Sequence, residues 1–424
     1  MLQIYKRIQP FCGDFKRIGQ KVPAILLLLP LMLCAACGDD DPADEPTPVV
    51  PENPTPTDPT PKPDEPKPGD GDEVTRFVGG DLSMLTQYEG QRAQYLDKSG
   101  KSIPNLLDFV KEQGWNTVRL RLFVDPSHSG DKAVCQDLGY VKALARRVKD
   151  AGLHVMLDFH YSDTWADPGK QWTPAAWATM DDAQLATQLY DYTRDCLQQL
   201  TAAGATPDFI QTGNEISYGM LWGTEAAVAS KQTNRCYTNS PQAHWDRFFL
   251  LLGQATRACR EVCPQAKIII HSERTPKPDV LTDYYDRLRK ANIDYDVIGL
   301  SYYPYFHGKL DVLEKALTQL VAKDYGKTIQ IVETGYPWKW EVPGTTVDYS
   351  ATYPYSNAGQ RQYTADLISL LKRFPQVTGL SWWYAEANAR GCTGSLSNGW
   401  YNASLFDNET GRALNALYEL KSFM

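Results

Sequence analysis

The chain has 424 residues and a formal net charge of −8, but this charge is unevenly distributed. Residues 38–73 contain twelve acidic side chains against two lysines, whereas residues 1–37 carry five basic side chains against one acidic. Residues 74–424 are therefore close to neutral, which argues against a phosphate-binding surface and nucleic-acid binding. A body of this length and apolar content can bury a large core, so fibrous, collagen-like and wholly disordered classes are excluded.

The first 37 residues have the features of an export signal. Five basic side chains precede an apolar run over 22–33, which is shorter than the about 20 residues that a membrane-spanning helix needs. Two alanines stand directly before Cys37, and this arrangement resembles a bacterial lipoprotein cleavage site, which implies that Cys37 is lipidated. The alternative is an ordinary secretory signal with an incidental cysteine.

Residues 38–75 are rich in proline and acidic side chains. Such a segment cannot bury enough apolar surface to offset the entropy of ordering it, so we expect a disordered linker. The acidic run 39–41 resembles the export signal of bacterial surface lipoproteins. This resemblance implies an outer-membrane lipoprotein exposed at the cell surface, attached to the membrane through its lipid, and we expect a monomer.

Six cysteines remain beyond the signal. They are Cys135, Cys196, Cys236, Cys259, Cys263 and Cys392. An even number in an exported protein permits disulfides, but their pairing stays open. No cysteine or histidine pair has the spacing of a zinc site, so we expect no metal ligands among them.

Residues 76–424 alternate short β-branched runs with longer amphipathic helical patterns such as 138–151. The strand-like runs are 77–81, 117–123, 154–159, 209–212, 268–271, 297–301, 329–333 and 379–383. Eight strands separated by helices favour a closed (β/α)8 TIM barrel over an open sheet. We therefore expect one α/β catalytic domain over residues 76–424.

The active site of such a barrel lies at the C-terminal ends of its strands. Polar or aromatic side chains that a core does not require occur at most of the predicted strand ends. They are Arg119, Arg121, Asp158, His160, Asn214, Glu215, His271, Tyr302, Tyr303, Glu333, Trp382 and Trp383. These residues are candidates for the site.

Glu215 and Glu333 follow the fourth and seventh strands, which lie on opposite sides of the barrel. Two carboxyl groups about 5 to 5.5 Å apart suit retaining glycoside hydrolysis, one as general acid/base and one as nucleophile. Asn214 is placed to bind a sugar hydroxyl, while Arg119 and Tyr303 are placed to keep Glu333 charged. The alternative is that each glutamate caps a helix or forms a structural ion pair.

Tryptophans are concentrated in or beside the expected βα loops, among them Trp165, Trp338, Trp382 and Trp383. Sugar rings present C–H groups that stack on aromatic faces, so this distribution favours a carbohydrate-binding groove. The alternative is that these side chains pack the core, as large aromatic residues commonly do.

Five segments are similar to motifs of one enzyme family. They are Gly-Asp-Leu-Ser at 80–83, Val-Arg-Leu-Arg at 118–121, Asp-Phe-His-Tyr-Ser-Asp-Thr-Trp-Ala-Asp-Pro-Gly-Lys-Gln at 158–171, Gly-Asn-Glu-Ile at 213–216 and Ser-Tyr-Tyr-Pro at 301–304. Over about residues 77–420 the chain resembles the endo-β-1,4-galactanases of glycoside hydrolase family 53. The run Ser-Asp-Thr-Trp-Ala-Asp-Pro is highly specific, whereas Gly-Asn-Glu is shared by many barrel glycosidases.

The resemblance implies a retaining, endo-acting hydrolase of β-1,4-galactosidic bonds in pectic galactan and type I arabinogalactan, with Glu215 as acid/base and Glu333 as nucleophile. It implies no cofactor for catalysis and leaves a structural calcium open. Combined with the strand-end and tryptophan patterns, it gives the expected substrate-binding residues. These are Arg119, Asp158, His160, Asp163, Trp165, Asn214, Tyr303, Trp338, Trp382 and Trp383.

The chain departs from the family at residues 383–386, which read Trp-Tyr-Ala-Glu where similar enzymes often read Trp-Glu-Pro. The number of subsites and the length of the products therefore stay open. Two other functions remain as alternatives: a barrel mannanase, cellulase or xylanase, and a non-catalytic glycan-binding surface lipoprotein. The second alternative has no need of both carboxylates.

Overall fold

The computed structural model describes residues 74–229, 233–237, 239–394, 396 and 401–424. The expected signal over 1–37, with Cys37, lies outside the described residues, as does the expected linker up to residue 73. Within the described ranges, no helix has the length and apolar character needed to cross a membrane.

Eight parallel strands close into a barrel in chain order, and β1 pairs with both β2 and β8. The strands are β1 (Phe77–Asp81), β2 (Thr117–Leu122), β3 (His154–Phe159), β4 (Phe209–Thr212), β5 (Lys267–Ser272), β6 (Val297–Tyr302), β7 (Thr328–Thr334) and β8 (Val377–Trp382). Every run predicted from the sequence corresponds to one of these strands within two residues at each end. The predicted (β/α)8 barrel is confirmed.

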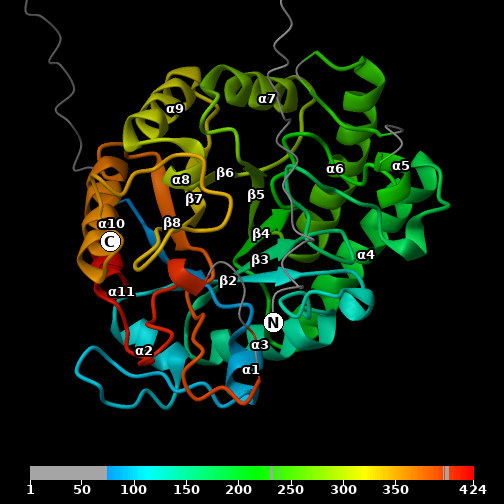
Figure 1. Cartoon of the computed structure of the whole chain (residues 1–424). Coiled ribbons are helices and arrows are strands. Elements are labelled where there is room, and N and C mark those ends of the chain that lie inside the picture. Colours follow the sequence, from blue (N-terminus) through cyan, green and yellow to red (C-terminus); the bar gives the residue numbers. More distant parts are fainter. Residues whose placement is uncertain (1–73, 230–232, 238, 395, 397–400) are drawn as a thin grey trace, which may run out of the picture. The chain divides into compact units, whose positions relative to one another are not determined.

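Helices surround the strands, which lie at the centre of Figure 1. They are α1 (Leu85–Gly90), α2 (Leu106–Glu112), α3 (Leu138–Asp150), α4 (Asp182–Ala202), α5 (Glu225–Ala229), α6 (Gln242–Val262), α7 (Pro278–Lys290), α8 (Pro304–His307), α9 (Leu310–Lys323), α10 (Asn357–Leu371) and α11 (Asn415–Glu419). Short 3₁₀ turns occur at Pro126–His128, Ala175–Trp177, Tyr401–Ala403 and Leu420–Phe423. The predicted helix over 138–151 is α3 and ends one residue earlier.

The main core lies between the strands and the helices, and α3 shows how the sequence builds it. Its side chains at Val141, Leu144 and Val148 are buried on one face, as their spacing predicts. The Asp137 carboxylate accepts a hydrogen bond from the Tyr140 backbone N–H and so caps the helix N-terminus.

The interior of the barrel has an apolar layer covered by a polar one. A small apolar cluster lies inside the barrel. It consists of Met156, Phe209, Ile269, Val297 and Val332, with Phe77 packed against it. Side chains of a strand alternate between its two faces, so residues two positions further along also point inward. Asp158, Gln211 and His271 hold those positions on β3, β4 and β5, and all three are completely buried.

An irregularity in β7 changes which side chains face the interior. The β7–β8 register shifts between Ile331 and Thr334. Val332 belongs to the apolar interior cluster, yet its neighbour Glu333 contacts Arg119 and Tyr303 at the mouth of the barrel. Adjacent residues of a regular strand face opposite sides, so the bulge allows both side chains to point inward.

All six cysteines of the body are described, and all six have free thiols in this structure. Cys259 and Cys263, which are four residues apart around the end of α6, are both buried and pack in the core without a disulfide. Burial raises the pKa of the Cys263 thiol, so it stays protonated at neutral pH.

Candidate active site

Glu215 and Glu333 meet at the C-terminal end of the barrel, as the sequence predicts. One carboxylate oxygen of each, together with a ring nitrogen of His271, lie within 4.8 Å of one another. Glu215 has a φ of 49°, in the left-handed region that costs a non-glycine residue about 1–3 kcal/mol. Gly213, with a φ of 108°, lets the chain make this sharp turn directly after β4.

Glu333 is held by two donors that the sequence analysis had named. Arg119 Nη2 lies 2.8 Å from Glu333 Oε1, and the Tyr303 hydroxyl donates to Glu333 Oε2 at 2.8 Å. Burial raises the pKa of Glu333, while Arg119 and the Tyr303 hydrogen bond oppose this rise. Both groups stabilise the carboxylate, which is the form that a nucleophile requires.

In the part of the chain that the structure describes, no cation pairs with Glu215, which accepts a hydrogen bond from Ser301 Oγ at 2.6 Å. Its pKa is raised well above the ordinary value, first by burial and then by the negative charges of Glu333 and Glu273. Of the two glutamates, Glu215 therefore holds a proton more readily, because Arg119 favours ionisation of Glu333.

His271 fixes the hydroxyl that contacts Glu215. Its Nδ1 atom accepts hydrogen bonds from the Glu215 backbone N–H at 3.2 Å and from Gln211 Nε2 at 2.8 Å. The Glu215 N–H can only donate, so we place the ring proton on Nε2, which is 2.8 Å from Ser301 Oγ. Asn214 Oδ1 lies 3.1 Å from Nδ1 and accepts its hydrogen bond from Arg119 Nη2. Burial lowers the pKa of His271 well below its usual range, so a neutral imidazole donates to Ser301, and Ser301 donates to Glu215.

The sequence analysis did not single out Gln211 or the role of Ser301. Both side chains are completely buried at inward positions of β4 and β6. Their signal was available: a polar residue two positions after an apolar interior residue, as Gln211 follows Phe209, marks the polar layer of the barrel.

Arg119 is the centre of the polar layer and is completely buried. Its Nη2 atom lies 2.8 Å from Asp158 Oδ2 and donates to Asn214 Oδ1 at 3.0 Å, while Nη1 lies 3.3 Å from Asp81 Oδ2. Asp158 is also completely buried, in contact with Arg119 and Gln211. The contacts of Asp158 in this structure are therefore with residues that position the site.

Asn214 and His160 are both tied to the loop after β3. Asn214 Nδ2 donates to the Ala166 carbonyl at 2.8 Å, which leaves one amide hydrogen for other partners. His160 Nδ1 accepts from the Ala166 N–H at 3.0 Å, and its Nε2 lies 3.1 Å from Asp158 Oδ2. The side chain of Asp163 accepts backbone N–H groups of Asp125 and Ala175 and braces the same loop.

Two of the four predicted tryptophans, Trp165 and Trp383, lie beside Arg121. Trp165 and Trp383 are partly exposed, and their ring centroids lie 5.9 Å apart in an edge-to-face arrangement. The Arg121 guanidinium carbon lies 4.7 Å from the Trp165 ring and 4.8 Å from the Trp383 ring. These contacts hold both rings in place beside the site.

The expectation that Trp382 binds substrate directly does not agree with its burial. Its side chain is 0 % exposed, and its indole N–H donates to the Ala403 carbonyl at 2.7 Å. Trp382 precedes Trp383, and alternation directs the two rings to opposite sides. Trp338 lies in the loop after β7, is partly exposed, and has the Lys339 ammonium 5.6 Å from its ring.

Among the described residues, one group of three possible metal ligands comes together, and it consists of Glu215, His271 and Glu333. Both nitrogens of His271 already have protein partners. Calcium prefers sets of six to eight oxygen ligands, which this group does not provide. The expectations about calcium and about catalysis without a cofactor stay predictions.

Comparison with known proteins agrees with this geometry. The model of the family described as "Glycosyl hydrolase family 53" matches residues 77–420. An arabinogalactan endo-β-1,4-galactanase of Cellvibrio japonicus is 32 % identical over 354 residues, which cover 80 % of this chain and 88 % of that protein. One of Humicola insolens with the same name is 31 % identical over 318 residues, covering 73 % and 89 %.

Solved structures give the same result. The catalytic domain of a family 53 protein of Ignisphaera aggregans superposes with a TM-score of 0.71 at 32 % identity, covering 84 % of this chain and 98 % of that one. One of two fungal β-1,4-galactanases superposes with a TM-score of 0.67 at 30 % identity, covering 82 % and 99 %. A family 10 endoxylanase, with a TM-score of 0.53 at 14 % identity, shares the fold alone. The chain therefore belongs to glycosyl hydrolase family 53 and is a glycosidase.

Proposed function

We propose that the protein is a retaining endo-β-1,4-galactanase in which Glu215 is the general acid/base and Glu333 the nucleophile. The observation that carries this proposal is the pair of carboxyl groups with oxygens within 4.8 Å in contrasting environments. Inverting enzymes need about 6.5–9.5 Å between these groups to admit a water molecule, and retaining enzymes need about 5–5.5 Å.

In the first step, Glu215 gives its proton to the oxygen of the leaving sugar while Glu333 attacks the anomeric carbon. The C–O bond to the leaving sugar breaks, and an ester bond between the sugar and Glu333 forms. Arg119 and Tyr303 orient the attacking carboxylate, because each holds one of its oxygens at 2.8 Å.

In the second step, Glu215 takes a proton from water, which attacks the anomeric carbon and releases Glu333. The change of role follows from electrostatics. The ester form of Glu333 carries no negative charge, so one of the causes that raise the pKa of Glu215 is removed. Ser301 stabilises the resulting Glu215 carboxylate by donating a hydrogen bond to it.

The proposed substrate is β-1,4-galactan, as in pectic galactan and type I arabinogalactan. Family membership and the printed names of the relatives support this choice. Trp165 and Trp383 offer aromatic edges and faces to sugar C–H groups, and Asn214 has one amide hydrogen left for a sugar hydroxyl. We propose that Asp163 and His160 act on the substrate by fixing the Trp165 loop.

Purified protein tests this proposal directly. We expect it to release reducing ends from debranched galactan, with products of several lengths at early times, and to leave mannan, cellulose and xylan intact. Glu215→Gln and Glu333→Gln should each lose nearly all activity, while Glu112→Gln, an exposed change at the end of α2, should retain it. Hydrolysis of another polysaccharide instead would favour a different barrel glycanase, and binding without turnover would favour a glycan-capture protein.

We also propose that the enzyme is a monomeric outer-membrane lipoprotein at the cell surface, with Cys37 lipidated, residues 1–37 as signal and residues 38–75 as linker. The sequence alone supports this location. Metabolic labelling with a fatty-acid analogue should mark the wild type and not Cys37→Ala. Added protease should remove the catalytic domain of residues 76–424 from intact cells.

A further inference from the structure

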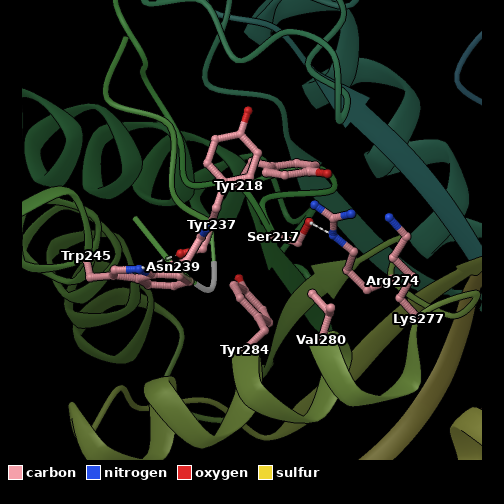
Figure 2. Close-up of a pocket in the computed structure, with 9 residues that line it drawn as sticks. All are labelled: Ser217, Tyr218, Tyr237, Asn239, Trp245, Arg274, Lys277, Val280 and Tyr284. Carbon is pink, nitrogen blue, oxygen red and sulfur yellow. Dashed lines mark hydrogen bonds between the residues drawn. The ribbon is translucent and has the colours of Figure 1, made fainter. Parts of the chain in front are cut away.

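A small pocket is lined by residues of the segments after β4 and β5, of α6 and of the first turns of α7. Its volume is about 140 Å³. Figure 2 shows the residues that line it, which are Ser217, Tyr218, Tyr237, Asn239, Trp245, Arg274, Lys277, Val280 and Tyr284. We call it the Tyr218 pocket.

The Tyr218 pocket lies on the acid/base side of the cleft. Ser217 is two residues after Glu215, and its hydroxyl donates to Glu273 Oε1 at 2.6 Å. Arg119, which holds Glu333, comes from β2 on another side of the barrel. Because Glu215 protonates the leaving group in the proposed reaction, the departing part of the polymer lies on the side of this pocket.

Among the described residues that line the pocket, two are cations and none is acidic. Arg274 Nε donates to Ser217 Oγ at 3.0 Å and lies 3.1 Å from Glu273 Oε1. Within the described part of the chain, neither Nη atom of Arg274 has a hydrogen-bond acceptor and Lys277 has no ion-pair partner. Figure 2 shows both side chains on the same side of the pocket, pointing in the same direction.

Arg274 and Lys277 carry two positive charges, and recognition of a neutral polymer does not require both of them. The Arg274 side chain is only 11 % exposed, and its guanidinium carbon lies 3.6 Å from the Tyr218 ring centroid, which fixes its position. Glu273 is shared with Ser217 and neutralises one charge at most. A bound carboxylate could accept hydrogen bonds from the Nη atoms of Arg274 and pair with the Lys277 ammonium.

We propose that the Tyr218 pocket is a subsite for the leaving-group part of the substrate and that Arg274 and Lys277 in it bind a carboxylate, as carried by an acidic sugar. This inference rests on the proposed function, since it requires Glu215 to be the acid/base. The exposed Tyr237 ring at the rim, 39 % exposed, provides an aromatic surface for the same sugar.

Two substrates of equal length test the proposal. One is a linear β-1,4-galactotetraose whose reducing end has been oxidised to the aldonate, and the other is the same tetraose reduced to the neutral alditol. Both ends are open chains, so they differ mainly in the carboxylate. We expect kcat/KM for the aldonate to exceed that for the alditol by about tenfold, and added salt to reduce this ratio.

Arg274→Gln and Lys277→Gln should each bring the ratio towards one. Lys290→Gln is the matched control, because it removes the same charge at the far end of α7 and should leave the ratio unchanged. Lys277 is exposed, so its replacement keeps the test valid if the buried Arg274 variant fails to fold.

Equal kcat/KM values in the wild type, or a preference that both variants retain, would overturn the inference. Failure to cleave either tetraose or galactan would instead overturn the proposed function. The two failures are therefore distinguishable.

Discussion

Arg119 Nη2 and Glu333 Oε1 lie 2.8 Å apart, and the Arg119 side chain is completely shielded from solvent. Asp158 and Asp81 also contact the guanidinium, so its position does not depend on the substrate. A buried cation in this position gives the carboxylate at the end of β7 a negative charge despite its burial.

Arg119→Gln should reduce kcat on galactan by about 10²- to 10³-fold, as removal of one preorganised donor commonly does. The pKa of Glu333 is raised by burial and held down by Arg119, so it should rise further in the variant. A nucleophile must be ionised, and the acid limb of the pH–rate profile should therefore move to higher pH. Arg146→Gln on the exposed surface of α3 is the control. An unchanged acid limb would contradict this role.

Ser301→Ala should slow hydrolysis of the glycosyl-enzyme more than its formation. The Ser301 hydroxyl donates to Glu215 and lowers its pKa, so the pKa should rise in the variant. The acid form is required in the first step, and the alkaline limb should shift to higher pH. Pre-steady-state kinetics with an activated aryl galactoside should show a burst in the variant, and Ser301→Thr should restore turnover in part.

Glu273→Gln should shift the alkaline limb in the opposite direction. The charge of Glu273 is one cause of the raised pKa of Glu215, and burial raises the pKa of Glu273 itself to about 7. Removing this charge lowers the pKa of Glu215, so the acid form is lost at lower pH. The amide keeps an oxygen for the Ser217 hydroxyl. A shift of the alkaline limb to higher pH in Glu273→Gln would contradict the role given to Glu273.

Glu386 links stability to pH outside the reacting groups. It is completely buried, and burial, followed by the charge of Asp81, raises its pKa to about 8. The folded state holds this proton more tightly than the unfolded state, whose pKa is about 4.3. Between these values the free energy of unfolding should fall as pH rises, by up to about 1.4 kcal/mol per pH unit.

Glu386→Gln should remove this fall of the free energy of unfolding with pH, because the amide does not titrate. The amide oxygen can still accept the hydrogen bond from the Met84 backbone N–H. Urea unfolding at several pH values between about 5 and about 8 measures it. The variant should gain on the wild type as pH rises, and parallel curves would show that Glu386 does not titrate in this range.

Trp382 and Trp383 should respond differently to replacement by alanine. Trp382→Ala removes a completely buried ring and should cost about 3–5 kcal/mol of stability. Trp383→Ala removes a partly exposed ring beside Trp165 and should raise KM for galactan with a smaller loss of stability. Thermal unfolding and steady-state kinetics of both variants check this difference. An unchanged KM in Trp383→Ala would show that Trp383 does not bind the substrate.

The sequence predicted the barrel because β-branched runs and amphipathic helices carry periodic patterns that do not depend on distant contacts. It also predicted that Glu215 and Glu333 meet, since strand order places them across one mouth. The bulge in β7 was not predictable, because a shift of register depends on the neighbouring strands. Without it, alternation would direct Glu333 away from the interior that Val332 occupies.

Contacts between distant strands were equally hidden. The hydrogen bonds from His271 to Ser301 and from Ser301 to Glu215 join β5, β6 and the loop after β4. Only the folded barrel brings these three residues together. The misplacement of Trp382 has a local cause. Trp382 is the last residue of β8 and Trp383 the first residue beyond it, and the sequence does not show at which residue the strand stops and the exposed loop begins.

The apolar cluster of Met156, Phe209, Ile269, Val297 and Val332 seals the barrel beneath the reacting groups. The cluster contains no polar side chain, so we expect Glu215 to exchange protons at the mouth of the barrel. In the proposed reaction, the proton that Glu215 gives to the leaving sugar is replaced by one from the attacking water. We therefore expect the second step to wait for departure of the first product, which opens the route for that water.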